Sequence, residues 1–297
     1  MKNKFVHNAL VFFAILTMTI TGAMANTLEK AKTTGKFTLA YRESSIPFSY
    51  LGEDGKPLGF GWEMCKLIAE EVKKETGRKD LVVESQAVTS QNRIPLIQNG
   101  TVDVECGSTT NNSERGKQVT FAINYFYTGT RFLVKSDSGI KSINDLKGKK
   151  VVSTTGTTNY QILRNLNDEK KYGFELLGAK DHADALLMVE SGMANAFGMD
   201  DILLYGLKAS SKESAKLAVV GESIQVEPYA IMFRKDDPKF QALVNKVITN
   251  SMKSGEFEKA YKKWFQTNIP PKNVNLNAPM SKELKDNLKA LSDKPAL

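Results

Sequence analysis

The sequence predicts an α/β protein made of two similar lobes with a binding cleft between them. Residues 93–108 and 185–200 share one plan, in which an apolar helix reaches a glycine and a short apolar strand follows. A second pair, residues 35–45 and 148–158, repeats a strand that opens into a polar loop. Ligands of open α/β sheets bind beyond the carboxyl ends of the strands. Two facing lobes would therefore present four polar loops to one cleft.

The first 25 residues have the pattern of a secretory signal peptide. Two lysines precede an apolar run over residues 9–20, and Ala23-Met24-Ala25 offers small residues for cleavage. The run is shorter than the roughly 20 residues of a spanning helix and threonines interrupt it, so cleavage after Ala25 is favoured over a membrane anchor. We therefore expect an exported protein.

Charge and cysteine content narrow the class of partner. The 297-residue chain has a formal net charge of +8, but no basic run with interleaved aromatic residues favours nucleic acid. Cys65 and Cys106 could form a disulfide in an exported protein, or both could remain buried thiols. Beyond the signal peptide His182 is the one histidine, and neither cysteine has a partner at ligand spacing, so no metal or other cofactor is expected.

Strands and helices alternate through the first half of the chain, which favours a mainly parallel sheet. Apolar residues at helical spacing between Trp62 and Val72 indicate one of the helices. The pattern predicts strands over residues 37–41, 81–88 and 102–106, helices over 61–74 and 92–99, a short helix from about 112, and an extended segment from 121 to 134.

The alternation starts again at Ile143 and ends in a helical region. We expect helices over residues 143–148, 160–166, 182–191 and 201–209, and strands over 151–154, 174–177, 194–197 and 217–220. An extended crossing at 227–234 leads to an amphipathic helix after Pro238 and another after Gly255. The tail from 269 to 297 is polar with one helical stretch.

This order of elements predicts a discontinuous architecture. One lobe comprises residues 27–128 and 229–297, and the second, 130–226, is inserted into it. Extended crossings near 127–132 and 226–231 join the lobes, and paired strands of this kind act as a hinge. Two sequential domains are the alternative, but no Pro/Ser/Gly-rich linker separates the halves.

Arginines stand at the strand exits of the first lobe. Arg42 follows a strand, Arg93 opens a helix, and Arg115 follows the loop that begins at Ser108. Taken alone, Arg115 also suits a surface ion pair with Glu114. Three guanidinium groups beside one cleft would repel one another, which indicates an anionic ligand with more than one charge.

Residues of complementary chemistry follow the strands of the second lobe. Asp200 could receive an ammonium group, and Thr157 and Thr158 could supply hydroxyl and N–H groups. An amino acid with an acidic side chain fits both signs of charge.

Catalytic motifs are absent from the sequence. There is no G-x-S-x-G, H-E-x-x-H, P-loop or strand-linked G-x-G-x-x-G pattern. A Ser-His-Asp triad would have to recruit His182, and the neighbouring Asp181 and Asp184 are explained as helix N-terminal acids. A non-enzymatic binding protein is therefore expected.

Several short motifs are distributed along the chain after the signal peptide. They are Arg42-Glu-Ser-Ser-Ile-Pro-Phe-Ser49, Thr89-Ser-Gln-Asn-Arg-Ile-Pro95, Glu105-Cys-Gly-Ser-Thr-Thr-Asn-Asn112, Gly156-Thr-Thr158, Ala179-Lys-Asp-His182 and Ile269-Pro-Pro-Lys-Asn273. Together they resemble the periplasmic glutamate/aspartate-binding proteins of bacterial ABC importers, in solute-binding protein family 3, and the likeness spans nearly all the chain after the signal peptide. The resemblance implies a type II periplasmic binding protein fold, with L-glutamate or L-aspartate as ligand and an inner-membrane ABC permease as partner. We expect a periplasmic monomer.

The resemblance also implies a ligand set. Ser108, Thr110 and Arg115 would hold the α-carboxylate, and Asp200 the α-ammonium group. The side-chain carboxylate would meet Arg42, Ser90, Arg93 and His182, with Thr157 and Thr158 bonding from the second lobe. Relatives carry a second cysteine near the motif that ends in Arg234; this chain has Ala230-Ile231-Met232 there and carries Cys65 instead. The family's disulfide is therefore not carried over.

Two other functions compete with solute binding. A periplasmic enzyme on the same scaffold, similar to a dehydratase, would need an acid in the cleft, and Glu43 is the nearest candidate. A sensory or adhesin-like surface protein would use the basic face, but no transmembrane or signalling segment follows.

Overall fold

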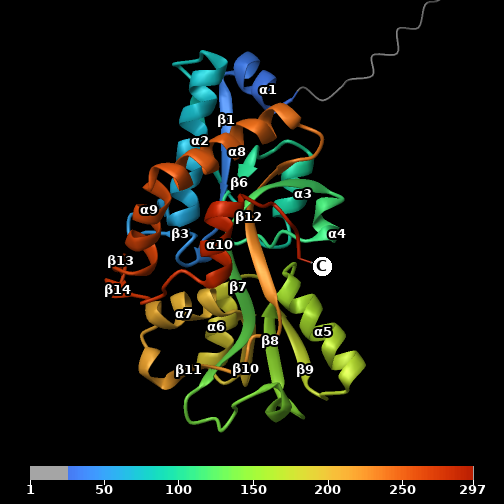
Figure 1. The fold of residues 1–297 in the computed structure, drawn as a ribbon. Helices are drawn as coiled ribbons and strands as arrows, with labels where there is room; N and C mark the ends of the chain where they lie inside the picture. The colour runs from blue at the N-terminus through green and yellow to red at the C-terminus, as the bar shows by residue number, and fades with distance from the viewer. Residues whose placement is uncertain (1–25, 297) are drawn as a thin grey trace, which may run out of the picture.

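The computed structural model describes residues 26–296 and shows two lobes joined by long strands (Figure 1). The predicted signal peptide lies outside the described residues. Elements from the two ends of the chain make up the upper lobe of Figure 1, and those from its middle make up the lower lobe. In the described part of the chain, no helix is long and apolar enough to cross a membrane.

The sheet of the first lobe combines parallel and antiparallel strands. Its order is β5 (Val82–Ala87), β1 (Lys36–Tyr41), β6 (Val104–Glu105), β12 (Val226–Arg234) and β7 (Val119–Lys135). β5, β1 and β6 are parallel, whereas β12 is antiparallel to β6 and β7. The helices of this lobe are α1 (Thr27–Thr34), α2 (Phe60–Thr76), α3 (Arg93–Gln98), α4 (Ser113–Gly116), α8 (Pro238–Ser254), α9 (Glu256–Phe265) and α10 (Lys282–Ala290).

The second lobe repeats this plan. β10 (Ala196–Asp200), β8 (Lys150–Thr154) and β9 (Glu175–Ala179) are parallel, while β7 and β11 (Leu217–Val220) add antiparallel pairs. The α-helices α5 (Thr158–Lys170), α6 (His182–Glu190) and α7 (Asp201–Ser210) follow β8, β9 and β10, and the 3-10 helices are η1 (Ile143–Leu146) and η2 (Ser214–Lys216). The predicted alternation is confirmed. In each lobe one strand runs against the others, β12 in the first lobe and β7 in the second, so both sheets are mixed.

β7 connects the lobes as one continuous strand of 17 residues. Its first part pairs with β12, from Val119 opposite Arg234 to Gly129 opposite Val226, and its second part pairs with β10 and β11. The predicted pair of extended crossings is therefore present. Because both lobes share β7, a change in its twist or bend would alter the angle between them.

Short elements without a clear repeat were not predicted from the sequence. These are α1, the small sheet of β2 (Ser44–Ser45), β3 (Ser49–Leu51) and β4 (Pro57–Leu58), and the pair β13 (Asn268–Ile269) and β14 (Val274–Asn275). The strand predicted over residues 102–106 is reduced to β6. Two- and three-residue strands show too few residues for an alternating pattern, so tertiary pairing decides them.

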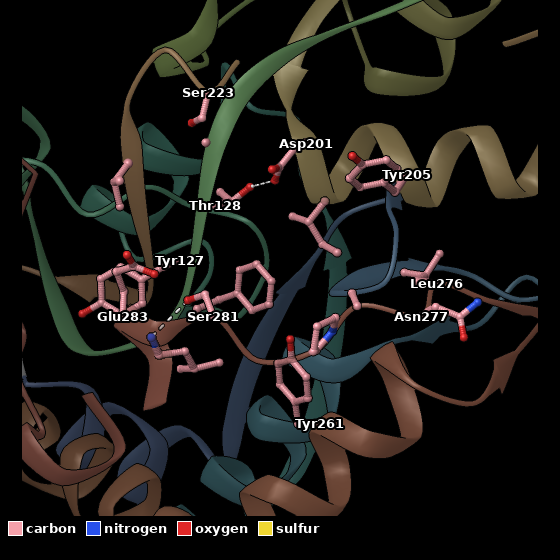
Figure 2. Close-up of a pocket in the computed structure, with 17 residues that line it drawn as sticks. Tyr127, Thr128, Asp201, Tyr205, Ser223, Tyr261, Leu276, Asn277, Ser281 and Glu283 are labelled. Carbon is pink, nitrogen blue, oxygen red and sulfur yellow. Dashed lines mark hydrogen bonds between the residues drawn. The ribbon is translucent and has the colours of Figure 1, made fainter. Parts of the chain in front are cut away.

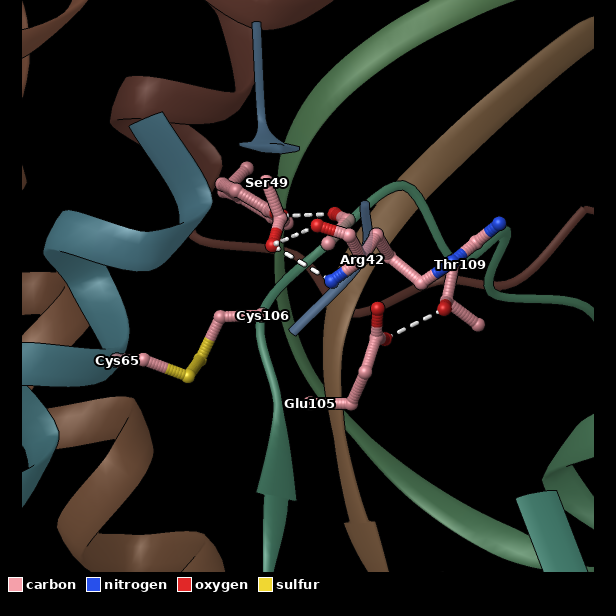
Figure 3. The surroundings of a disulfide bond; sticks show 8 residues. Arg42, Ser49, Cys65, Glu105, Cys106 and Thr109 are labelled. Carbon is pink, nitrogen blue, oxygen red and sulfur yellow. Dashed lines mark hydrogen bonds between the residues drawn. A yellow bond between two sulfur atoms is a disulfide. The ribbon is translucent and has the colours of Figure 1, made fainter. Parts of the chain in front are cut away.

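The two cysteines form a disulfide that joins α2 to the end of β6. The Cα atoms of Cys65 and Cys106 are 5.6 Å apart (Figure 3). The sequence was compatible with either a disulfide or two free thiols, and the structure contains the disulfide. Cys106 directly precedes Gly107 and the predicted ligand residue Ser108, so the bond fixes the start of that loop to the helix layer.

Candidate functional site

The three predicted arginines are buried at the junction of the lobes. Their exposed fractions are 0% for Arg42, 2% for Arg93 and 8% for Arg115. A cavity of about 10 Å³ lies between them and the second lobe, with room for about one water molecule. Its lining contains all the predicted ligand residues except Arg42 and Arg115, namely Ser90, Arg93, Ser108, Thr110, Thr157, Thr158, His182 and Asp200.

Larger hollows have no arginine among their lining residues. The one in Figure 2 has a volume of about 480 Å³, lies beside β7 and the segment before α10, and is lined by Tyr205, Tyr261 and Glu283 among others. Another, of about 660 Å³, is lined mainly by α2, with residues of β5 and α9 beside it. Neither contains a buried arginine, so we place the candidate site at the small cavity, where the charged groups meet.

The cavity is small because the lobes are closed on each other. An Arg115 Nη2 hydrogen bond to the Gly156 carbonyl oxygen, 3.1 Å long, crosses between the lobes. The hydroxyl oxygens of Thr110 and Thr158 are 3.2 Å apart, and the Ser44 hydroxyl donates to Asp181. A ligand of amino-acid size would enter by separating these contacts and would then replace them.

Arg42 and His182 face each other across the junction. Arg42 Nη2 lies 3.3 Å from His182 Nε2 and 3.6 Å from Asp181 Oδ2. A guanidinium group can only donate, so Nε2 accepts and Nδ1 carries the ring proton toward Thr154 Oγ1, 2.8 Å away. Burial, and then the positive charge of Arg42, lowers the pKa of His182 to about 3. His182 is therefore neutral near pH 7 and orients Arg42.

The low pKa of His182 predicts acid sensitivity of the ligand-free protein. The unfolded chain takes up a proton near pH 6.5, whereas the folded protein does not until about pH 3, so stability falls as pH decreases between these values. For His182 alone, the loss between pH 7 and pH 5 is roughly 2 kcal/mol. The glutamine of the His182→Gln variant stays neutral. Between pH 7 and pH 5 the free energy of unfolding of this variant, measured in urea, should therefore fall by roughly 2 kcal/mol less than that of the unaltered protein. Equal losses in both proteins would show that His182 does not titrate in this way.

Arg93 has polar hydrogens without partners. Its Nε and Nη1 atoms, like Nε and Nη1 of Arg42 and the hydroxyl of Ser90, are buried and find no hydrogen-bond partner within residues 26–296. Burial first, and then the charge of Arg115, lowers the pKa of Arg93 to about 9, while Glu105 opposes this shift. Leaving buried donors unpaired costs free energy, and a carboxylate placed between these groups would offset it.

Arg115 belongs to the loop that follows β6. Its Nη1 donates to the carbonyl oxygen of Thr110 at 3.0 Å, and its backbone N–H donates to Asn112 Oδ1, which caps α4. Burial lowers the pKa of Arg115, whereas the carboxylates of Glu227 and Asp200 act in the opposite direction. In the same loop, the Ser108 hydroxyl donates to Ser45 Oγ at 3.2 Å. The loop thus lies between both lobes and against the carboxylates opposite.

Acceptor groups gather on the far side of the cavity. Asp200 is 2% exposed and accepts from Tyr229 and, at 2.7 Å, from Asn159. Its pKa is raised well above its usual value by burial and by Glu227. The hydroxyl groups of Thr110 and Thr158 both donate to Glu227 Oε2. A hydroxyl has one hydrogen, so both can offer only lone pairs to a ligand.

Thr157 contributes mainly to the backbone. Its hydroxyl donates to the Thr154 carbonyl oxygen at 2.6 Å and accepts from the Tyr160 N–H at 3.1 Å, which makes it the N-cap of α5. Its hydroxyl hydrogen is therefore already used. What the start of α5 offers a ligand is its N-terminal N–H groups, which favour an anion.

Sequence reasoning missed two buried acids of this site and two of its neutral polar residues. Glu105 is fully buried beside Arg42, and its Oε2 accepts from Thr109 at 2.5 Å (Figure 3). Glu227 and Tyr229 stand two residues apart on β12 and so share one face. A glutamate inside an otherwise apolar strand was a usable signal for Glu227. No local signal pointed to Asn159, because its role depends on where α5 meets β10.

The fold and the site together define a binding protein for a small anionic ligand. Two lobes close over a cavity whose guanidinium groups have free donors and whose opposite wall offers acceptors. The chain belongs to the bacterial extracellular solute-binding proteins, family 3, whose model matches residues 37–267.

Individual relatives support this assignment. The chain is 48% identical over 289 residues to the L-glutamate/L-aspartate-binding protein of Pseudomonas aeruginosa, covering 97% of this chain and 96% of that protein. It is 46% identical over 272 residues to the glutamate/aspartate import solute-binding protein of Escherichia coli K12, covering 92% and 90%. Among solved structures, an ancestral arginine-binding protein bound to glutamine has a TM-score of 0.70 at 29% identity and covers 78% of this chain and 98% of that one.

The rival enzyme hypothesis loses its main support. Glu43, the acid proposed for it, is exposed and does not line the cavity. The relatives named above are solute-binding proteins, and this chain is a binding protein rather than an enzyme. Within residues 26–296, no group of three or more His, Cys, Asp and Glu side chains is placed to hold a metal ion.

Proposed function

We propose that this protein captures L-glutamate and L-aspartate outside the cytoplasm and delivers them to an ABC importer. The observation that carries the proposal is the set of buried, unpartnered N–H groups on Arg42 and Arg93 within one closed junction. A ligand carboxylate supplies the missing acceptors. The names of relatives with 46% and 48% identity agree with this ligand class.

The ligand's two ends would meet different groups. Arg42, Ser90, Arg93 and His182 surround the side-chain carboxylate, with His182 acting through Arg42. The α-carboxylate meets Arg115, Ser108 and the N–H groups that begin α5 at Thr157 and Thr158.

The α-ammonium group has three hydrogens to donate. Asp200 accepts one, and the hydroxyl oxygens of Thr110 and Thr158 can accept the others, because Glu227 holds both hydroxyl hydrogens. This modifies the family-based expectation for Thr110, whose hydroxyl now serves the ammonium group rather than the α-carboxylate.

Capture would proceed by closure of the lobes. We assign residues 27–128 and 229–297 to one lobe and 130–226 to the other, with β7 and β12 as the hinge. A ligand bonded to both lobes has higher affinity for the closed form and shifts the population toward it.

The remaining parts of the proposal concern location and assembly. The signal peptide would be cleaved after Ala25, placing a monomer in the periplasm. There the closed form would dock onto the inner-membrane permease of its importer.

Titration calorimetry over the common amino acids tests the function. We expect tight binding of L-glutamate and L-aspartate, and at least about hundredfold weaker binding of L-glutamine, because its amide leaves a buried guanidinium without a counter-charge. The protein must first be unfolded and refolded, which removes ligand retained from the host. Equal affinity for glutamine and glutamate would contradict the proposal.

A further inference from the structure

The C-terminal segment, residues 282–296, lies where the two lobes meet. It is next to the loop that carries Ser108, Thr110 and Arg115, here called the ligand loop. In Figure 1 the red helix α10 lies in front of β7, and the last residues run toward α4. This segment follows residue 267, where the match to the family model ends. Its contacts with the site are therefore not accounted for by the family match alone.

Asn111 connects this segment to the ligand loop between Thr110 and Arg115. Its Nδ2 donates to the carbonyl oxygen of Asp293 at 2.7 Å, and its carbonyl oxygen accepts from the Ala296 N–H at 2.9 Å. On its other side, the Asn111 N–H donates to the Pro228 carbonyl oxygen of β12 at 2.8 Å. The side chain is 3% exposed. The loop is thus held between a hinge strand and the C-terminal segment.

Asn124 connects the same segment to the hinge strand β7. Its N–H donates to the Ser292 carbonyl oxygen at 3.0 Å, and its Nδ2 donates to that of Lys294 at 2.8 Å. Its Oδ1 accepts from Asn111 Nδ2 at 2.9 Å. Asn287 of α10 completes the set by donating to the Asn124 carbonyl oxygen at 2.7 Å. Three buried asparagines therefore join the loop, the hinge and the C-terminal segment.

We propose that residues 292–296 position the ligand loop, with Asn111 as the residue through which they act. This inference rests on the function proposed above. The loop has little regular structure of its own, since α4 comprises four residues. Side chains that must meet a ligand accurately need neighbours that fix their backbone, and a loop ordered in advance loses less entropy on binding. The C-terminal segment supplies that order for Thr110 and Arg115.

The position of the contacts predicts which ligand groups depend on them. The loop carries Ser108, Thr110 and Arg115, which face the α-carboxylate and α-ammonium groups in the proposed site. L-glutamate and L-aspartate share these groups and differ only in side-chain length. Loosening the loop should therefore lower the affinities for L-glutamate and L-aspartate by the same factor. A change at Arg42 or Arg93 should instead alter the ratio of the two affinities.

Two variants test the inference, Asn111→Ala and a chain ending at Leu291. Asn167→Ala is the control, since the Asn167 side chain makes three hydrogen bonds, to Gly173 and Phe174 at the far end of α5, against two made by the Asn111 side chain. We expect both test variants to bind each amino acid about tenfold more weakly than the unaltered protein, with an unchanged glutamate-to-aspartate ratio. The control should lose thermal stability but keep its affinities. Calorimetry at 25 °C on protein shown to be folded gives the readout.

The outcomes separate this inference from the function it rests on. If the unaltered protein binds neither acid, the proposed function is wrong. The positioning role could then still be tested, by comparing the affinities of the same variants and the unaltered protein for an amino acid that does bind. Unchanged affinity in both folded test variants would overturn the positioning role, as would an equal loss in Asn167→Ala. If the truncated chain does not fold, Asn111→Ala decides alone.

Discussion

Replacing Arg93 with methionine should raise the thermal stability of the ligand-free protein and nearly abolish binding of L-glutamate. Arg93 is 2% exposed, and two of its nitrogens find no partner in the described chain. Methionine fills similar space without a buried charge, and it removes buried donors whose lack of a partner costs about 1–3 kcal/mol. The ligand would lose a charge-assisted pair, a loss of at least about a hundredfold in affinity.

Thermal unfolding and calorimetry measure the two effects on one preparation. Arg164→Met is the matched control, because Arg164 is exposed on α5 and bonds only to Gln161 among the described residues. The control should change neither property appreciably. A variant at Arg93 that is less stable and still binds glutamate would mean that its guanidinium group supports the fold instead of the ligand.

Asp200→Asn should reverse the preference between L-glutamate and glutarate, its analogue without the amino group. In the unaltered protein, Asp200 provides the negative charge opposite the ammonium group, so glutamate is favoured. The variant should bind glutamate about a hundredfold more weakly, since a buried ammonium group loses its counter-charge. Glutarate should bind the variant at least as well as the unaltered protein, because no carboxylate then repels it.

The same substitution should change the pH dependence of the ligand-free protein. Burial raises the pKa of Asp200 well above its usual value, so the folded state holds this proton more tightly than the unfolded chain. Stability therefore decreases as pH rises above about 4, and asparagine removes this contribution. Urea unfolding between pH 4 and pH 7 compares the two, with Asp168→Asn on the exposed face of α5 as control. If all three proteins show parallel pH profiles, Asp200 is not the group that titrates.

Much of the site could be predicted because it stands at strand ends. Arg42, Arg93 and Asp200 each lie where a strand ends or a helix begins, and parallel strands bring such positions to one edge. Eight of the ten predicted ligand residues line the cavity, while Arg42 and Arg115 contact the lining residues His182 and Thr110. The acids Glu105 and Glu227 were not assigned in this way, because both lie within strands (β6 and β12) rather than in the loops that follow them.

Local periodicity and residue type were sufficient to predict the two-lobed α/β class, the repeated strand-and-loop plan and the basic character of the cleft. Packing was needed to show that Cys65 and Cys106 are bonded and that His182 faces Arg42. It also brings the C-terminal segment into hydrogen-bond contact with Asn111 of the ligand loop. Each of these contacts joins groups that are far apart in the chain. A disulfide or a hydrogen bond of about 3 Å forms only where packing brings the two groups together, and sequence spacing does not show where that happens.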